Sequence, residues 1–222
     1  MFLIVRTKDQ IRKTEKFFNA QSISVASFAV SSTVFNKIEI EDGVDGFIVT
    51  SPNAVLSIPQ TKLPFFCVGS ATEQEAVDTG RRIAYTGRLG ATEMAVDVAK
   101  KFPPETLIHA AGDMAETEWY NILEKEGIHV IKKLAYETKY TTEIDVDTLK
   151  VLQGDTLKAL VFFSVQGIIT FTKLLQNNNI DPQKFSLIAF SENIALQGSM
   201  YKNILIAEEP SLNAVKNIMQ SF

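Results

Sequence analysis

The stretches FIVTSPNAV (residues 47–55) and VFFSVQGII (residues 161–169) share a pattern in which a short apolar run ends at a serine. Apolar runs of this length, bounded by turn residues, are typical of fully buried strands. Ser51 and Ser164 then stand where a helix N-cap is expected, and Pro52 fits the first helical position. Each stretch predicts a strand-to-helix junction, which is either an ordinary connection or an anion-binding site.

The order of predicted elements occurs twice along the chain. Strand–helix–strand, a polar stretch at residues 31–43 and three further strand–helix pairs reach to about residue 101, and a similar series begins at residue 106. Strands that alternate with helices build parallel sheets, so we expect an α/β fold of two small lobes. The polar stretches at 31–43 and 137–147 hold equivalent places. Each half of the chain could form one lobe, or these stretches could be crossings between exchanged halves.

Capping residues predict several helix boundaries. Thr72 and Glu75 match a capping box for a helix that starts at Thr72 and stops at Gly80. The acidic segment that begins at Asp113 predicts a helix from that residue, because carboxylates favour the positive end of the helix dipole. The prolines at 103–104 are expected to end the helix before them.

Composition excludes several classes of protein. The 222 residues are 45% hydrophobic and 22% charged, as in globular proteins. No window approaches the ~18 apolar residues of a membrane span, and the start does not match a signal peptide. The single cysteine excludes an internal disulfide, and the net charge of −4 offers no footprint for nucleic acid. We expect a cytoplasmic protein that binds neither nucleic acid nor membranes.

No standard catalytic motif is present. His109 and His129 lie on separate predicted strands without ligand spacing, and a lone strand histidine is more often packed or exposed than catalytic. Cys67 is interpreted as a small buried hydrophobic residue. The phosphate loop, the dinucleotide fingerprint and the nucleophile elbow are all missing. We therefore expect no metal site and no cofactor.

Hydroxyl residues at strand ends are the remaining candidates. Ligands of open α/β sheets bind beyond the carboxyl ends of the strands, where helix N-termini offer free N–H groups. Taken singly, each such residue is an ordinary cap. Their recurrence in both repeats predicts an anionic or carboxylate ligand held in a cleft. These junction residues are Ser51, Thr72, Ser164 and Ser191.

Set side by side, these segments resemble the uroporphyrinogen-III synthase family. FIVTSPNAV resembles the family's first Thr-Ser-Pro junction, and CVGSATEQEAVDTG resembles its Val-Gly-x-Ala-Thr segment. LAYET matches the end of the stretch that closes in Val-Tyr-x-Thr, VFFSVQG resembles Phe-Phe-Ser-Pro-Ser-Gly, and IAEEPS resembles Ala-x-x-Pro-Thr. The five segments follow the family's order over nearly the whole chain.

The resemblance implies two α/β lobes joined by a two-stranded linker, with the active-site cleft between them. Residues 1–34 with 143–222 would form one discontinuous domain, and residues 35–142 the inserted domain with the linker strands. The implied reaction is the cyclisation of hydroxymethylbilane to uroporphyrinogen III in heme biosynthesis, a lyase reaction with loss of water and inversion of ring D. It needs no metal or cofactor. We expect a monomer that contacts hydroxymethylbilane synthase transiently.

The resemblance also assigns roles in binding a linear tetrapyrrole that carries many carboxylates. Tyr136 matches the family's tyrosine and would be the general acid, because a phenol is protonated at neutral pH. Most of the catalysis would come from holding the substrate in the shape that favours inverted closure. Closure of the lobes would exclude water. The predicted substrate-binding residues are Ser51, Thr72, Ser164, Lys184, Ser191 and Arg6.

One departure from the family pattern bears on activity. The segment AFSEN stands where the family has Gly-Pro-Thr-Thr, so Glu192 puts a carboxylate where a polyanion is expected to bind. Two alternatives to the enzyme therefore stay open. One is a non-catalytic two-lobed protein that binds a small polycarboxylate, and the other is a regulatory or structural relative without activity.

Overall fold

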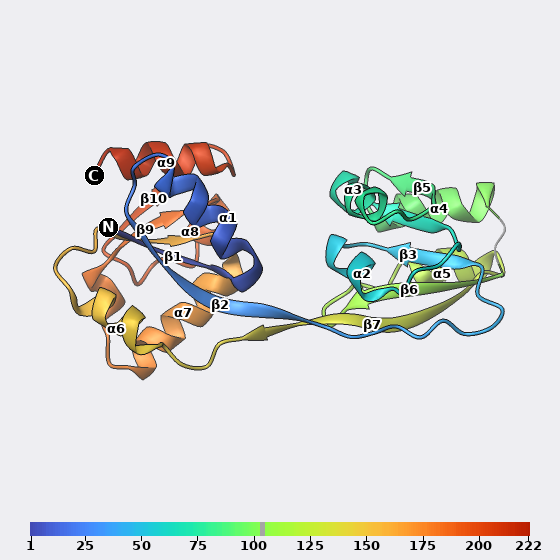
Figure 1. The fold of residues 1–222 in the computed structure, drawn as a ribbon, viewed down its shortest axis with the longest axis horizontal. Helices are drawn as coiled ribbons and strands as arrows, with labels where there is room; N and C mark the ends of the chain where they lie inside the picture. Colours follow the sequence, from blue (N-terminus) through green and yellow to red (C-terminus); the bar gives the residue numbers. More distant parts are fainter. Residues whose placement is uncertain (103–104) are drawn as a thin grey trace. The chain divides into compact units, whose positions relative to one another are not determined.

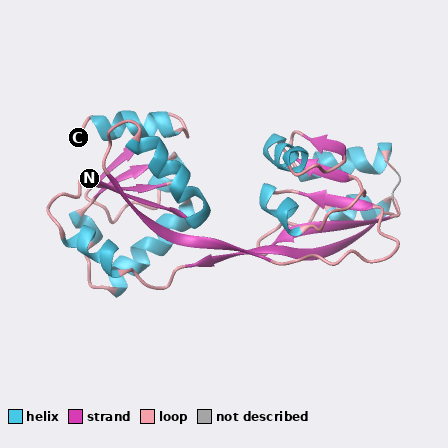
Figure 2. Ribbon diagram, in the orientation of Figure 1, coloured by secondary structure: helices cyan, strands magenta, loops and turns pink. Residues whose placement is uncertain are grey.

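Strands and helices alternate along nearly the whole chain in the computed structural model, which describes residues 1–102 and 105–222 (Figure 2). The predicted mixed α/β class is confirmed. The proline pair at 103–104, expected to end a helix, lies outside the described residues. No helix in the described part of the chain is both long and apolar enough to cross a membrane. The chain divides into unit 1 (Met1–Thr33 and Lys139–Phe222) and unit 2 (Val34–Thr138).

Unit 1 is built on five neighbouring strands (Figure 1). β1 pairs in parallel with β2 and β8, and β9 pairs in parallel with β8 and β10. The runs FLIV, ALVF and LIA are buried at every residue, which explains why they read as continuous apolar stretches. In spatial order the strands are β10 (Asn203–Ile206), β9 (Ser186–Ala189), β8 (Ala159–Phe162), β1 (Phe2–Thr7) and β2 (Val25–Phe35).

Helices cover both faces of this part of the sheet. Leu3, Leu160 and Leu187 share a core with α6, α7 and α8, whereas Ile4, Val161 and Ile188 share a core with α1 and α9. The alternation of side chains along a strand separates the two cores. The helices are α1 (Lys8–Asn19), α6 (Val146–Gln153), α7 (Val165–Asn177), α8 (Glu192–Ala195) and α9 (Leu212–Gln220), with a short 3-10 helix, η1 (Pro182–Lys184).

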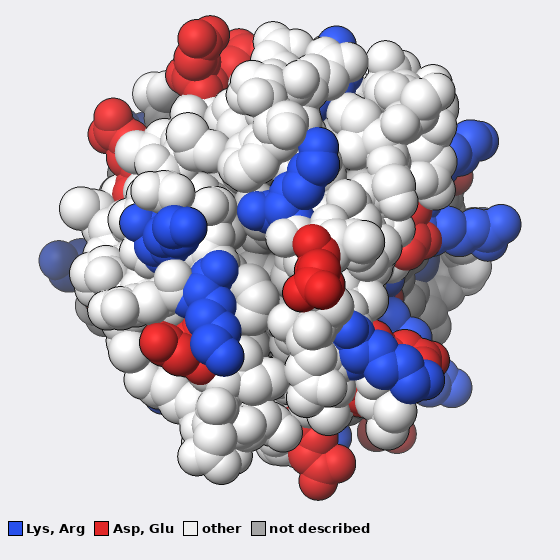
Figure 3. Space-filling model, turned by 90° about the vertical axis from the view of Figure 1, so that its left-hand side faces the viewer, with Lys and Arg blue, Asp and Glu red and all other residues white. Residues whose placement is uncertain are grey.

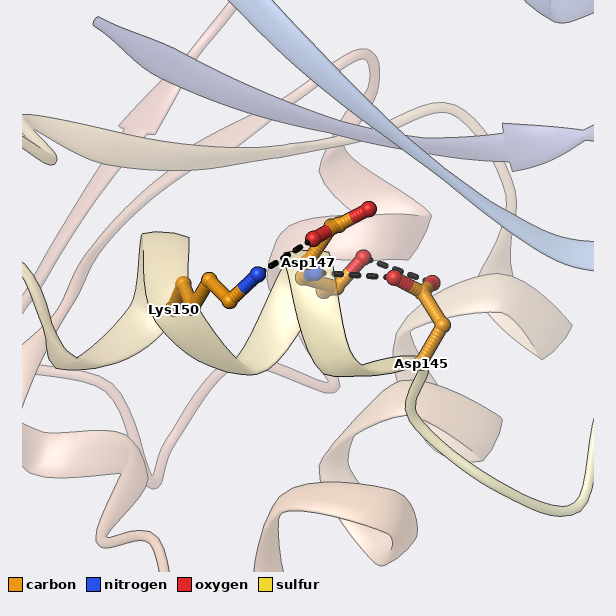
Figure 4. A network of polar contacts seen from close by, with 4 residues as sticks. Asp145, Asp147 and Lys150 are labelled. Carbon is orange, nitrogen blue, oxygen red and sulfur yellow. Dashed lines mark hydrogen bonds and ion pairs between the residues drawn. The ribbon is translucent and has the colours of Figure 1, made fainter.

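The start of α6 shows the local chemistry that fixes these helices. Asp145 is the N-cap, and its carboxylate accepts hydrogen bonds from the main-chain N–H and the hydroxyl of Thr148, both at 2.8 Å (Figure 4). Asp147 and Lys150 form an ion pair of 2.8 Å one turn apart on the exposed side. The cap satisfies N–H groups that the helix itself leaves without a partner.

Unit 2 repeats the arrangement with a second parallel set of strands. Phe47, Val49 and Ala110 lie in the core under α2 and α3, and Ile48 and Leu107 lie in the core under α4 and α5. The spatial order is β7 (His129–Tyr140), β6 (Thr106–Gly112), β3 (Gly46–Val49), β4 (Phe65–Val68) and β5 (Ile83–Gly87). The helices are α2 (Pro52–Ser57), α3 (Ser70–Asp78), α4 (Ala91–Lys101) and α5 (Tyr120–Lys125).

The polar stretches at residues 31–43 and 137–147 both begin inside a strand. β2 runs to Phe35 and β7 to Tyr140, and the two strands are neighbours in the strand order. Within unit 1, the N–H of Thr141 donates to the carbonyl of Val30 at 2.9 Å, and within unit 2 the N–H of Asn36 donates to the carbonyl of Ala135 at 2.8 Å. The chain therefore passes from unit 1 to unit 2 along β2 and returns along β7.

Two helix starts predicted from the sequence are wrong. α3 begins at Ser70, and its N-cap is Gly69, whose φ of +81° suits glycine, so Thr72 lies inside the first turn and forms no capping box. The helix expected from Asp113 begins only at Tyr120, where apolar packing begins with Trp119 and Leu123. The stop at Gly80 is confirmed, with a φ of +73° just past the C-cap.

Candidate active site

Parallel pairing brings three predicted site residues to one edge of unit 1. Val5 pairs with Phe162, and Phe162 pairs with Ala189, so the carboxyl ends of β1, β8 and β9 are level. The residue after Val5 is Arg6. Two residues after Phe162 comes Ser164, and two residues after Ala189 comes Ser191. We refer to these three residues together as the unit 1 edge.

Arg6 is a cation held in place by its neighbours. Its guanidinium lies 4.3 Å from the centre of the Phe163 ring, and one N–H donates to the hydroxyl of Thr14 at 2.8 Å. Burial lowers the pKa of Arg6 from its ordinary value, but an arginine stays charged at neutral pH. Phe163 in turn packs on Phe190, with ring centres 5.2 Å apart. The charge is therefore fixed beside the residue that precedes Ser164.

Ser164 caps α7 as predicted. Its backbone is extended, and its hydroxyl oxygen accepts the N–H of Gly167 at 3.0 Å. A Cβ added at Gly167 would lie 2.7 Å from that oxygen, so the cap needs glycine at this position. The remaining N–H groups of the first turn of α7 point out of the helix end and are available to an acceptor.

Ser191 precedes the four-residue helix α8, and its side chain makes no capping hydrogen bond. It lines a hollow of about 500 Å³ together with Glu192, Glu208 and Glu209. Three carboxylates around one hollow oppose an anionic ligand. Ser191 is therefore placed at the predicted edge, but its surroundings are acidic.

Lys184 and Thr72 lie apart from these edge positions. Lys184 ends η1, just before β9 begins, so it lies at the amino end of a strand whose carboxyl end leads to Ser191. It lines a different hollow of about 520 Å³ with Asp155 and Asn179. The Thr72 side chain is 2% exposed inside α3, which leaves only its main-chain N–H near the helix start.

In unit 2, Ser51 and Tyr136 lie at the corresponding edge, which we call the unit 2 edge. Ser51 caps α2 and accepts the N–H of Asn53 at 3.3 Å. It follows Val49, which pairs with Ala110 of β6, and Gly112 of β6 pairs with Tyr136 of β7. The strands β3, β6 and β7 therefore bring Ser51 and Tyr136 to the same level.

Tyr136 rests directly on Gly112. A Cβ added at Gly112 would lie 2.7 Å from Cζ and 2.8 Å from the hydroxyl oxygen of Tyr136. The register of β6 and β7 shifts between Ala111 and Gly112, and the N–H of Asp113 donates to the carbonyl of Tyr136 at 3.2 Å. The missing side chain of Gly112 is what makes room for the phenol.

His109 is a buried polar residue that the sequence did not single out for function. It is fully buried on β6, with Nε2 at 3.2 Å from the Thr50 hydroxyl and Nδ1 at 2.5 Å from the Tyr120 hydroxyl. Burial, and to a smaller degree the charge of Lys132, lower the pKa of His109 to about 4. The imidazole is neutral at physiological pH. Its role as a packed histidine agrees with the expectation, but its partners link the ends of two strands.

Arg88 is a basic residue of the unit 2 edge that the sequence analysis did not name. It follows β5 at the unit 2 edge, is largely exposed, and pairs with the carboxylate of Glu73 at 2.8 Å. The segment GRLG after a predicted strand was the available signal. Elsewhere on the surface, the face seen in Figure 3 mixes acidic and basic residues without a patch of one sign. Within residues 1–102 and 105–222, no three His, Cys, Asp or Glu side chains are placed to hold a metal ion.

Comparison with protein families matches residues 15–216 to the family described as uroporphyrinogen-III synthase HemD. The chain belongs to the uroporphyrinogen-III synthase family. The family predicted from the sequence is confirmed. The match also supports the function predicted from the resemblance, and the binding-protein alternative is not favoured.

Solved structures agree with this family at the level of the fold. The uroporphyrinogen-III synthetase of Helicobacter pylori matches with a TM-score of 0.66 and 18% identity, over 100% of this chain and 99% of that chain. A mutant uroporphyrinogen III synthase of Thermus thermophilus matches with a TM-score of 0.52 and 12% identity, over 100% and 98%. No match was found among curated proteins.

The contact between Gly112 and Tyr136 predicts a specific effect of one methyl group. Gly112→Ala should lower the free energy of unfolding by about 1–3 kcal/mol, because the ring or the strand must move to admit the Cβ. The measurement is urea unfolding followed by the fluorescence of Trp119, the single tryptophan, which is buried in unit 2. In a Tyr136→Ala background the cost should nearly vanish. Equal losses in both backgrounds would show that the contact does not matter.

The neutral state of His109 predicts how stability depends on pH. Its pKa falls from an ordinary 6.5 to about 4 on folding, so between these values the unfolded chain binds a proton that the folded chain does not. Stability should therefore fall as the pH drops from about 6.5 to 4, by up to about 3 kcal/mol from this group. His109→Gln should remove that part of the slope in the same unfolding measurement. The exposed His129→Gln is the control and should keep it.

Proposed function

We propose that this chain catalyses the closure of hydroxymethylbilane to uroporphyrinogen III, as a lyase that uses no cofactor. The family supplies the substrate, a linear tetrapyrrole rich in carboxylates. The observation that carries the proposal is the level placement of a phenol, Tyr136, with the capped helix start at Ser51 on one edge. Such an edge offers a proton donor and N–H groups for carboxylates together.

Substrate carboxylates are bound by helix starts and by fixed cations in this proposal. At the unit 1 edge these are the N–H groups after Ser164 and the guanidinium of Arg6. Ser191 stays a predicted contact, although Glu192, Glu208 and Glu209 line the same hollow and oppose it. At the unit 2 edge the donors are the N–H groups that follow Ser51 and those of the first turn of α3, including that of Thr72. Exposed charges act over about 8 Å in physiological salt, so these local donors outweigh a net charge of −4. Lys184 stays a predicted contact whose position before β9 gives it no support.

Tyr136 donates a proton to the hydroxyl group that leaves the substrate. The C–O bond breaks, water departs, and the electron-rich pyrrole next to the reacting carbon carries the positive charge. The carbon of ring D that already bears the bridge to ring C attacks this carbon, and the bridge bond then breaks. The bridge re-forms at the free α-carbon of ring D, whose hydrogen leaves as a proton and replaces the one that Tyr136 gave up. The macrocycle is then closed with ring D inverted, and the net change is the loss of water. The phenol contributes modestly, and the fixed shape of the bound chain contributes most, because it selects the inverted closure.

The domain organisation belongs to the same proposal. We propose that units 1 and 2 correspond to the two lobes of the family fold, that β2 and β7 form the linker, and that both edges take part in binding. A substrate with many carboxylates needs more donors than one edge offers. We further propose that the chain works in the cytoplasm as a monomer, receiving its unstable substrate through transient contact with hydroxymethylbilane synthase.

The product isomer tests the function directly. Purified protein and freshly prepared hydroxymethylbilane should yield uroporphyrinogen III, because the enzyme selects inverted closure, whereas a reaction without protein yields the uninverted I isomer. The products are separated by chromatography after oxidation to porphyrins. A chelator should leave the yield of the III isomer unchanged. Formation of the I isomer alone would support the alternative of an inactive relative, in which the carboxylate of Glu192 prevents the substrate from binding.

The role of Tyr136 is tested by removing its hydroxyl. Tyr136→Phe should lower kcat by about a hundredfold, the low end for a general acid, while the thermal midpoint changes little, because the ring still rests on Gly112 and only the proton donor is lost. Tyr85→Phe is the matched control, since Tyr85 hydrogen-bonds to Asp97 away from the unit 2 edge and should leave kcat unchanged. An unchanged kcat for Tyr136→Phe would remove this residue from the mechanism.

A further inference from the structure

We propose that His109 and Tyr120 are positioning residues that orient the Thr50 hydroxyl as a hydrogen-bond donor for a substrate carboxylate. The inference rests on the proposed function and adds a specific contact to the unit 2 edge. His109 is buried and takes no direct part in the proposed proton transfer, so its role here is to hold another group in place.

Three side chains form one polar chain through this part of unit 2. The Tyr120 hydroxyl lies 2.5 Å from Nδ1 of His109, and Nε2 of the same ring lies 3.2 Å from the Thr50 hydroxyl. The imidazole is fully buried and packs edge-on against Trp119, with ring centres 5.0 Å apart. Aromatic packing and two hydrogen bonds leave the imidazole one orientation.

Contact lengths and protonation states together indicate the direction of these hydrogen bonds. Burial raises the pKa of Tyr120 to about 12, so its hydroxyl keeps its hydrogen, and the pKa of His109 at about 4 leaves the ring with one proton. Hydroxyl donors make shorter hydrogen bonds than N–H donors, so the 2.5 Å contact indicates that Tyr120 donates to Nδ1. The 3.2 Å contact then suits an N–H at Nε2 that donates to the Thr50 oxygen. The hydroxyl hydrogen of Thr50 is left to point toward another acceptor.

The location of Thr50 makes that free hydrogen useful. Ile48 of β3 pairs with His109 of β6, so Thr50 lies just past the paired part of β3 and directly before Ser51. Thr50 is partly exposed, whereas its partner His109 is not. A hydroxyl that donates to a carboxylate forms a short, charge-assisted hydrogen bond. The Thr50 hydroxyl would then add a donor to the N–H groups that follow Ser51 at the same edge.

The same polar chain joins two loops of the unit 2 edge. Thr50 belongs to the turn after β3, and Tyr120 is the first residue of α5, which follows the turns after β6. A change at either end therefore reaches the other through one imidazole. The two hydrogen bonds of the imidazole offset the free-energy cost of removing this polar side chain from water.

The tautomer can be measured without any activity assay. The chain has two histidines, so a long-range nitrogen–proton NMR spectrum of labelled protein at pH 7 contains two imidazoles, and the exposed His129→Gln variant assigns them. The inference expects His109 to carry its proton on Nε2. Tyr120→Phe should shift the ring toward a mixture of tautomers. A proton on Nδ1 in the unaltered protein would overturn the inference.

Kinetics separate orientation from mere packing. Thr50→Val, which keeps the shape of the side chain, should raise KM for hydroxymethylbilane about tenfold with little change in kcat. His109→Met should raise KM to a similar extent, whereas His109→Gln, which keeps an N–H donor for Thr50, should restore most of it. In the Thr50→Val background, His109→Met should raise KM no further, because the oriented donor is already gone.

The outcomes distinguish this inference from the proposed function. If the unaltered protein forms uroporphyrinogen III and Thr50→Val leaves KM unchanged, the function stands and the inference fails. Independent, additive effects of Thr50→Val and His109→Met would also overturn it, because they indicate packing alone. If the unaltered protein yields only the I isomer, the proposed function fails and the inference falls with it.

Discussion

Parallel pairing of buried strands is the constraint on which the rest of the structure depends. The central strands of both units are apolar on both faces, so each set needs helices on either side to exclude water. A helix must then connect each strand to the next, and every connection of this kind starts at the carboxyl edge of the sheet. Helix N-termini and their capping hydroxyls are gathered at that edge as a consequence of burial.

Caps that stabilise the fold are therefore also the groups available to a ligand. Ser51 and Ser164 each satisfy one N–H of the helix they start and leave others free. Arg6 adds a charge fixed over Phe163, whereas Glu192, Glu208 and Glu209 surround Ser191 with negative charge. In the proposed function, binding of the polycarboxylate therefore depends on short-range hydrogen bonds more than on overall attraction.

The unit 2 edge owes its shape to a missing side chain and a neutral ring. Gly112 admits the ring of Tyr136 where any Cβ would collide with it, and His109 stays uncharged because its surroundings exclude water. The residue type alone does not reveal the place of either residue at this edge. Their importance comes from what lies next to them across β6, β7 and β3.

The α/β class, the family and the capped junctions at Ser51 and Ser164 follow from the amino-acid sequence, because buried strands, N-cap residues and ordered segments are written in local residue patterns. Those patterns misplaced the starts of α3 and α5, since Gly69 and the packing of Trp119 decide those ends. Only the tertiary structure showed that Lys184 lies at the opposite end of β9 from Ser191, and that Thr50, His109 and Tyr120 form one polar chain. Strand register and the direction of a side chain depend on contacts between distant segments, and no local pattern encodes them.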